Sequence, residues 1–235
     1  MPPTTTPTDE SLDVAAMVFP APAGEAPIEV ADSKFGAAIY EPFLWLGERF
    51  GMADRRARLL GKAKGRVLEI GAGTGLNLRH YPPTGIEELV LAEPATAMAA
   101  KIDTSRGPGE APVSVVLAPA ERLPFADDSF DTVVSTMVLC TVTDPVQALD
   151  EVSRVLRPGG KLLFCEHVES DSRLLGAAQR RLAGPWAAFA EGCRCDRRTI
   201  ETIAARMRLG ATEQDSWRGM TPLVRPLVIG SAEPR

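Results

Sequence analysis

The chain has 235 residues, 45% of them hydrophobic and 24% charged, a composition typical of one soluble globular domain with short appendages. Its 26 Lys and Arg residues against 31 Asp and Glu residues give a net charge of −5, so we expect no nucleic-acid partner and no general attraction to anionic lipid. No apolar run reaches the roughly 18 to 20 residues that a membrane-spanning helix needs.

The cysteines and the first residues of the chain predict its location. Four cysteines are too few for a scaffold held by disulfides, which indicates a reducing, cytoplasmic compartment. Residues 1–10 lack the positive and apolar regions of a secretory signal and the arginines of a transit peptide, so no targeting segment is expected.

The amino-terminal part divides into two predicted segments. Residues 1–33 are rich in Pro, Thr and Ala without sustained periodicity, which predicts a flexible tail. Over residues 34–64 apolar residues recur at helical spacing that breaks near Gly51, which predicts two short helices forming a lid. Residues 65–235 then form the main domain.

Beyond residue 64 strand-like and helix-like segments alternate. Short apolar runs predict strands at 66–70, 88–92, 113–117, 131–135 and 161–165, and two closing strands at 211–217 and 223–229. Helical patterns lie at 94–102, 145–156, 174–189 and 196–207, and a further helix starts at 76–80. Asp144 and Pro145 are typical of a helix start, and Arg157 to Gly160 of a stop and a turn. The alternation predicts an α/β fold with a parallel, doubly wound sheet.

Three glycines, Gly71, Gly73 and Gly75, follow the first predicted strand. Glycines let the backbone approach a ligand, and the exposed amides of such a turn favour polar or anionic groups. The spacing G-x-G-x-G differs from the G-x-G-x-x-G of a dinucleotide site, whose third glycine would fall at Leu76. Glu69 at the strand end would repel a diphosphate and attract a cationic amine or sulfonium. The ligand is therefore not expected to be a dinucleotide.

Glu93 follows the second predicted strand, 18 residues after Gly75. A carboxylate at such a strand end can accept hydrogen bonds from both hydroxyls of a ribose. The alternative is a solvated Glu ahead of Pro94. The strand-end position favours ribose binding.

Several motifs, in this order, resemble those of the class I S-adenosylmethionine-dependent methyltransferases: Glu69–Gly75, Glu93-Pro94, Ala120–Phe125, Ser129–Asp131 and Val155–Gly160. The resemblance covers about residues 60–230. It implies a Rossmann-like sheet of seven strands, six parallel and the final one antiparallel, and it makes residues 65–235 a domain that binds S-adenosyl-L-methionine. The cofactor would lie over the carboxyl ends of strands one, two and four.

The resemblance also implies which residues bind the cofactor. Glu69, Gly71 and Gly73 would surround its methionine part, and Glu93 would hold its ribose. The full predicted set is Glu69, Gly71, Ala72, Gly73, Asn77, Glu93, Pro94, Ala120, Glu121 and Thr136.

The remaining positions of that set concern the adenine and the reactive sulfonium. By resemblance, Ala120 and Glu121 would contact the adenine edge, and Thr136 would lie beside the sulfonium. Many relatives have an Asp where this chain has Pro119. Glu121 or backbone groups must therefore recognise the adenine.

Shorter motifs resemble the alkyl-thiol S-methyltransferases of animal membranes and their soluble bacterial relatives: Thr136–Val142, Glu166–Val168, Pro185-Trp186 and Glu191–Cys193. This resemblance implies methyl transfer to the thiol of a small molecule, giving a thioether and S-adenosyl-L-homocysteine. A thiol has a pKa of about 8.5 and is partly ionised at neutral pH, so it needs little help from a base. The alternatives are an O- or N-methyltransferase of a natural product, quinone or lipid-like small molecule, and a cofactor-binding module without catalysis.

Two residues are predicted to act in catalysis. His167, at the end of the fifth predicted strand, is the candidate for a base or for orienting the substrate, and the alternative is a core histidine bonded to the backbone. Cys140 follows the fourth predicted strand, where a side chain can face the methyl group, although packing is the commoner role of a buried cysteine. Tyr40 of the lid, Trp186 and Cys193 are predicted to contact the substrate.

The pair Cys193 and Cys195 raises the question of a metal site. Zinc ligands usually follow one another at a wider spacing than C-x-C, and no second pair accompanies this one. No metal is predicted.

Overall fold

The computed structural model describes residue 45 and residues 47–235. The predicted tail, Tyr40 and the first part of the predicted lid lie outside the described residues. Within the described part of the chain, no helix is both long and apolar enough to cross a membrane.

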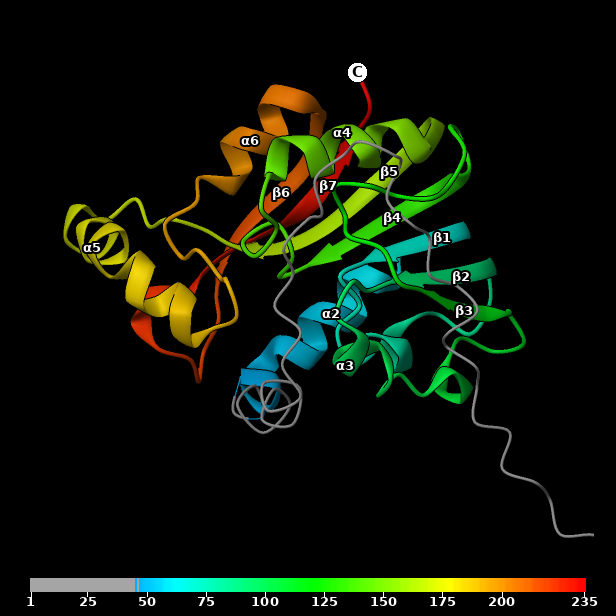
Figure 1. The fold of residues 1–235 in the computed structure, drawn as a ribbon, viewed down its shortest axis with the longest axis horizontal. Coiled ribbons are helices and arrows are strands. Elements are labelled where there is room, and N and C mark those ends of the chain that lie inside the picture. The colour runs from blue at the N-terminus through cyan, green and yellow to red at the C-terminus, as the bar shows by residue number, and fades with distance from the viewer. Residues whose placement is uncertain (1–44, 46) are drawn as a thin grey trace, which may run out of the picture.

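Seven strands form one mixed sheet in the described residues (Figure 1). They are β1 (Gly65–Ile70), β2 (Ile86–Ala92), β3 (Val113–Val116), β4 (Phe130–Thr136), β5 (Leu156–His167), β6 (Arg208–Ser216) and β7 (Pro226–Glu233). Their order is β3-β2-β1-β4-β5-β7-β6. Strands β1 to β5 pair in parallel, and β7 is antiparallel to both β5 and β6. The predicted class, the seven strands and the antiparallel final strand are confirmed.

Helices cover both faces of this sheet. The α-helices of the described residues are α2 (Ala53–Leu60), α3 (Thr96–Ala99), α4 (Pro145–Val155), α5 (Arg173–Phe189) and α6 (Thr199–Arg206). Figure 1 shows α4 and α6 on one side of the sheet and α2 and α3 on the other. The sheet is therefore doubly wound, as predicted.

The strands supply two cores because successive side chains point to opposite faces. The core beneath α4 and α6 contains Leu68, Val90, Val133, Leu162, Phe164, Leu149 and Ile203. The core beneath α2 contains Val67, Leu89, Val134, Leu163, Cys165, Leu59 and Leu60. The same alternation of side chains determines on which face of the sheet a residue at a strand end lies.

The described part of the predicted lid is divided at Gly51, as the sequence indicates. Its φ of 103° interrupts the helical turn Glu48–Met52, which precedes α2. Arg55 of α2 then donates two hydrogen bonds to the carboxylate of Asp215 in β6, at 2.5 and 2.8 Å. These bonds hold α2 against the sheet. That the segment acts as a lid stays a prediction.

The prediction of a helix starting at Leu76 is wrong, because only one helical turn forms there. The chain forms a single 3₁₀ turn, Leu78–His80, and then leaves the helical conformation at Tyr81, where φ is −68° and ψ is 146°. Pro82 and Pro83 follow. A residue before proline avoids the helical region, and a proline supplies no backbone N–H, so the helix stops here.

Other predicted boundaries also differ, among them that of the closing strand predicted over 211–217, which is β6 and begins at Arg208. The helix predicted over 94–102 is shortened to α3, because Ala95 is extended (φ −83°, ψ 112°). The closing strand predicted over 223–229 begins three residues later, because Pro222–Val224 forms a 3₁₀ turn. The helices predicted at 145–156, 174–189 and 196–207 are confirmed as α4, α5 and α6, within a few residues at each end.

Helix α4 starts where the sequence predicts. Pro145 is its first residue, and the carboxylate of Asp144 accepts hydrogen bonds from the amides of Val146 and Gln147 at 2.8 and 3.1 Å. At its other end the helix stops at Val155, as expected. The turn predicted at 157–160 is instead an irregular stretch inside β5, where the pairing with β4 shifts register.

Replacing Asp144 by Ala is expected to lower the free energy of unfolding by about 1 kcal/mol, because two amides of the first helical turn lose their acceptor. Urea unfolding followed by circular dichroism measures this change. Gln147→Ala is the matched control, since Gln147 is an exposed residue in the same turn. Equal losses in both variants would contradict the capping role.

Candidate functional site

The loop after β1 crosses the carboxyl edge of the sheet. Gly71 and Gly73 have φ values of 57° and 58°, in the left-handed region that other residues rarely adopt. A Cβ atom at Gly71 would lie 2.6 Å from a methyl group of Val138. The amide of Ala72 donates to the carbonyl of Ala92, at the end of β2, at 3.1 Å. The glycines thus allow the loop to lie tightly over β1 and β2.

Glu69 places a buried carboxyl group beneath this loop; the residue is 1% exposed. Asn77 Nδ2 donates to its Oε1 at 2.8 Å, and the hydroxyl of Tyr81 donates to its Oε2 at 2.6 Å. Burial raises the pKa of Glu69 to about 7, although both hydrogen bonds act to lower it. This carboxyl group therefore changes its charge near neutral pH.

Arg56 of α2 joins the glycine loop to the end of β4. Its guanidinium donates to Asn77 Oδ1 at 2.8 Å and to the hydroxyl of Thr136 at 3.2 Å. Asn77 Nδ2 donates to the same hydroxyl at 2.9 Å. Arg56 Nε also donates to Glu48 at 3.0 Å. The segment before β1 is therefore part of this site.

Glu69, Thr136 and His167 lie on one face of the sheet at its carboxyl edge. Glu69 pairs with Val134, and Thr136 pairs with Cys165. Thr136 follows Val134 by two residues, and His167 follows Cys165 by two, so each later side chain joins the same face. Val134 and Cys165 both belong to the core beneath α2. The three polar side chains thus form a row across β1, β4 and β5.

Glu93 lies at the end of β2 beside the glycine loop. Its carboxylate accepts hydrogen bonds from the amide of Gly73 at 2.7 Å and from the amide of Ala95 at 2.9 Å. The residue is 6% exposed, and Pro94 beside it is half-buried. The structure thus brings Glu93 to the loop, and its contact with a ribose stays a prediction.

Glu121 and Ala120 lie near the start of α4. The Glu121 carboxylate accepts hydrogen bonds from the amides of Thr143 and Asp144 at 2.7 and 3.3 Å. Ala120 packs in the core beneath α4. One carboxylate oxygen of Glu121 therefore fixes the loop after β4, and adenine contact by these residues stays a prediction.

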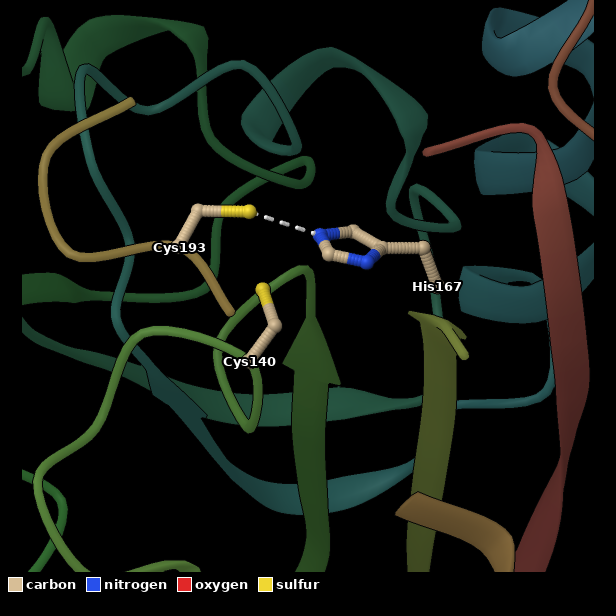
Figure 2. Close-up of side chains that lie close together, drawn as sticks. All are labelled: Cys140, His167 and Cys193. Carbon is tan, nitrogen blue, oxygen red and sulfur yellow. Dashed lines mark hydrogen bonds between the residues drawn. The ribbon is translucent and has the colours of Figure 1, made fainter. Parts of the chain in front are cut away.

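Cys140, His167 and Cys193 come together from three separate segments. Figure 2 shows the sulfur of Cys193 directed toward the imidazole of His167, with the side chain of Cys140 beside them. Cys193 Sγ lies 3.0 Å from His167 Nε2, and the indole N–H of Trp186 donates to the same sulfur at 3.2 Å. All three side chains are buried, and one ligand atom of each lies within 4.8 Å of the others. We call Cys140, His167 and Cys193 the thiol–imidazole cluster.

The groups of this cluster shift one another's pKa values. The hydrogen bond with Cys140 lowers the pKa of the Cys193 thiol, and the neighbouring His167 adds to this effect. The same hydrogen bond and burial raise the pKa of Cys140. Burial acts to lower the pKa of His167, but its bond to Cys193 and the charge of that sulfur outweigh burial and raise the pKa. Both shifts favour the charged forms of the two groups, the thiolate of Cys193 and the imidazolium of His167.

Sequence reasoning missed Arg56 and Tyr81. For Arg56 a signal was present: a charged residue stands four positions from both Met52 and Leu60, on the apolar stripe of the helix. Such a charge is buried only with partners. Tyr81 gave no comparable signal, because its partner Glu69 lies on the other side of the glycine loop.

A cleft of about 800 Å³ opens on another part of the surface. Its lining includes Val168, Arg180, Arg198 and Gln214, from the ends of β5 and β6 and from the region of α5 and α6. No predicted site residue of the described chain lines this cleft.

Comparisons with known proteins agree with this architecture. A family model described as a methyltransferase domain matches residues 68–164. Thiol S-methyltransferase TMT1A of Homo sapiens is 31% identical over 182 residues, which cover 71% of this chain and 69% of that protein. TMT1B of Homo sapiens is 36% identical over 65% of this chain. The match spans 66% of the human TMT1B and 57% of the TMT1B of Rattus norvegicus, less than two thirds of either protein.

Two further similarities extend over most of the chain. Ubiquinone/menaquinone biosynthesis C-methyltransferase UbiE of Marinomonas sp. is 29% identical over 93% of this chain and 78% of its own length. Among solved structures, a SAM-dependent methyltransferase of Thermotoga maritima, described as a possible histamine N-methyltransferase, has a TM-score of 0.63 at 24% identity. It covers 86% of this chain and 97% of its own.

Proposed function

Because the chain belongs to the class I S-adenosylmethionine-dependent methyltransferases, we propose that it methylates the sulfur of a small-molecule thiol. The products would be a thioether and S-adenosyl-L-homocysteine. TMT1A and TMT1B, two of its relatives, are thiol S-methyltransferases by name.

The proposed cofactor site follows the glycine loop. The carboxylate of Glu69 would attract the ammonium group of the methionine part, together with Asn77. Glu93 would turn its carboxylate to the ribose hydroxyls from the end of β2. Thr136, at the end of β4, would then stand beside the sulfonium. An acceptor would then bind next to Thr136, at the end of β5.

The position of the thiol–imidazole cluster favours a thiol as the acceptor. The thiol–imidazole cluster continues the row of Glu69 and Thr136 on the same face of the sheet, one strand further along. An acceptor sulfur bound at the cluster would therefore face the methyl group. Trp186 is half-buried and donates a hydrogen bond to Cys193. Its indole ring would pack against the rest of the acceptor.

The reaction needs positioning more than covalent catalysis. A sulfur lone pair of the acceptor attacks the methyl carbon, and the bond between that carbon and the sulfonium breaks, with its electrons passing to the departing sulfur. The proton of the acceptor thiol leaves before or during the attack. Holding the two sulfurs in line and excluding water are the tasks of the protein.

The match to UbiE, over 93% of the chain, supports a second candidate, the C-methylation of a quinone precursor. A panel of acceptors distinguishes thiol S-methylation from quinone C-methylation. In this panel the same aromatic ring carries a thiol, one phenolic hydroxyl, an amine or two phenolic hydroxyls. Mass spectrometry of the methylated product and of S-adenosyl-L-homocysteine is the measurement. Turnover confined to the thiol supports the proposal, and turnover confined to any other member overturns it.

The pKa of Glu69 gives the cofactor affinity a defined pH dependence. Since burial raises this pKa to about 7, the group is largely protonated at pH 5.5 and must lose its proton to pair with the ammonium of the cofactor. The Kd for S-adenosyl-L-methionine is therefore expected to fall about tenfold between pH 5.5 and pH 7. Isothermal titration calorimetry measures it.

The raised pKa of Glu69 makes cofactor binding stronger as the pH rises, but it makes the folded protein less stable. The cofactor-free protein is expected to lose stability as the pH rises from 4.5 to about 7, because the native state holds this proton more tightly than the unfolded chain. Glu69→Gln should flatten both profiles. A Kd of the wild type that does not change with pH would contradict the pairing of Glu69 with the cofactor ammonium.

A further inference from the structure

The thiol–imidazole cluster has the composition of a zinc site. Two sulfur atoms and one imidazole nitrogen converge within 4.8 Å, and all three side chains are buried. We propose that Cys140, His167 and Cys193 bind a zinc ion, and that the sulfur of the acceptor thiol takes the fourth position. The inference rests on the proposed function for the identity of that fourth ligand.

The distances fit this ligand set. Zinc bound tetrahedrally by sulfur at about 2.3 Å and nitrogen at about 2.0 Å holds its ligand atoms roughly 3.6 to 3.8 Å apart. In the structure Cys193 Sγ and His167 Nε2 are 3.0 Å apart, and the whole set lies within 4.8 Å. Side-chain adjustments of less than about 1 Å would therefore complete the coordination. Three protein ligands with one open position are typical of catalytic zinc.

Backbone and side-chain contacts hold the two cysteine segments together. The amide of Arg194 donates to the carbonyl of Cys140 at 2.8 Å, which joins the loop after α5 to the turn after β4. The guanidinium of Arg197 donates to the carbonyls of Leu139 and Val142 at 2.5 and 2.7 Å and braces the same turn. These contacts therefore fix the positions of the segments that carry Cys140 and Cys193.

The surroundings of the Cys193 sulfur also suit a metal site. The indole N–H of Trp186 donates to Cys193 Sγ, and such donors stabilise a metal-bound thiolate. His167 Nδ1 is buried and has no hydrogen-bond partner in the described residues. Zinc at Nε2 would leave the proton of the neutral imidazole on Nδ1.

The charges balance at every stage. A zinc dication with two thiolates and a neutral imidazole has no net charge, so the free site does not bury an uncompensated ion. The acceptor thiolate adds one negative charge, and the sulfonium of the cofactor adds one positive charge. Methyl transfer then converts both into neutral sulfurs.

Zinc would also lower the pKa of the acceptor thiol, so that no histidine is needed as a base in a chain that has only two. A thiol that coordinates zinc loses its proton to water, and the thiolate keeps a lone pair for the methyl carbon. As the new S–C bond forms, the S–C bond of the sulfonium breaks. The neutral thioether is a weaker ligand than the thiolate and leaves the metal, which restores the open position.

The test is the metal content of the 235-residue chain. The protein is purified under reducing conditions, incubated with zinc and then freed of excess metal. Inductively coupled plasma mass spectrometry should find about one zinc per chain. Cys140→Ser, His167→Gln and Cys193→Ser should each bind less than about a tenth of that amount. Cys195→Ser is the matched control, because Cys195 is buried two residues from Cys193 and its Sγ faces the carbonyl of Gln179 at 3.8 Å.

Cobalt substitution adds a readout that does not depend on activity. Tetrahedral cobalt with two thiolates should show sulfur-to-metal charge-transfer bands, and an added thiol should shift them. Binding of S-adenosyl-L-methionine by each variant shows that the variant is folded. A zinc-free wild type, or zinc retained by all three ligand variants, would overturn the inference.

The outcomes separate this inference from the proposed function. A wild type that binds no zinc and still methylates thiols would leave the proposed function standing and remove the zinc site. One zinc per chain, lost in the ligand variants, with no thiol methylated would keep the metal site and remove the proposed acceptor.

Discussion

Replacing Glu93 by Gln is expected to weaken the binding of S-adenosyl-L-methionine about 100-fold, because two charge-assisted hydrogen bonds to the ribose are worth roughly 1.5 kcal/mol each. Gln keeps one carbonyl oxygen but loses the second acceptor and the negative charge. The carboxylate also accepts from the amide of Gly73, so the glycine loop loses a contact in the same variant. Isothermal titration calorimetry at pH 7 gives the two Kd values.

Glu88→Gln is the control for this experiment. Glu88 lies in the same strand but toward its amino end, where it accepts a hydrogen bond from Arg66 at 2.5 Å in a partly exposed ion pair. Its loss should change the Kd less than twofold, since Glu88 lies at the end of β2 opposite to the glycine loop and contacts no proposed cofactor residue. Equal Kd values for Glu93→Gln and the wild type would remove Glu93 from the cofactor site.

The variant His167→Gln is expected to lower kcat for a thiol acceptor by about 100-fold or more, while the Kd for S-adenosyl-L-methionine changes less than twofold. The imidazole belongs to the thiol–imidazole cluster, which receives the acceptor sulfur in our proposal, whereas the proposed cofactor contacts lie at the ends of β1, β2 and β4. Single-turnover methylation separates the chemical step from product release.

The chain offers a natural control, because it has two histidines. His80 ends the 3₁₀ turn after the glycine loop and accepts a hydrogen bond from its exposed neighbour Arg79. His80→Gln should keep kcat within twofold of the wild type. A similar loss of kcat in both histidine variants would show that a general effect on the fold, and not the cluster, reduces activity.

Most of the fold could be predicted because its signals are local. Each strand is a short apolar run, and the start of α4 is marked by Asp144 and Pro145. Boundaries set by less regular backbone were the ones missed. The residues at 157–160 look like a turn, yet they continue into β5 because β4 provides a pairing partner on both sides of them. The pairing with β4 determines the conformation of residues 157–160, and no local sequence pattern indicates this pairing.

The site was predictable where one strand end determines a position, and less so where distant segments meet. Glu69, Thr136 and His167 could be placed on one edge from the parallel topology alone. The contact of Cys193 with His167 depends on how the loop after α5 folds back, so the spacing of Cys193 and Cys195 gave no guide to the ligand set. The role of Arg56 likewise depends on how α2 packs against the sheet.

The claim that this methyltransferase acts on sulfur is tested most directly by a single acceptor that carries both a thiol and a phenolic hydroxyl on one ring. The enzyme, S-adenosyl-L-methionine and this acceptor are incubated together, and tandem mass spectrometry with NMR locates the methyl group. We expect S-methylation with formation of S-adenosyl-L-homocysteine and no product methylated on oxygen or on the ring, as the claim requires. Methylation on oxygen or carbon, with the thiol left free, would contradict it.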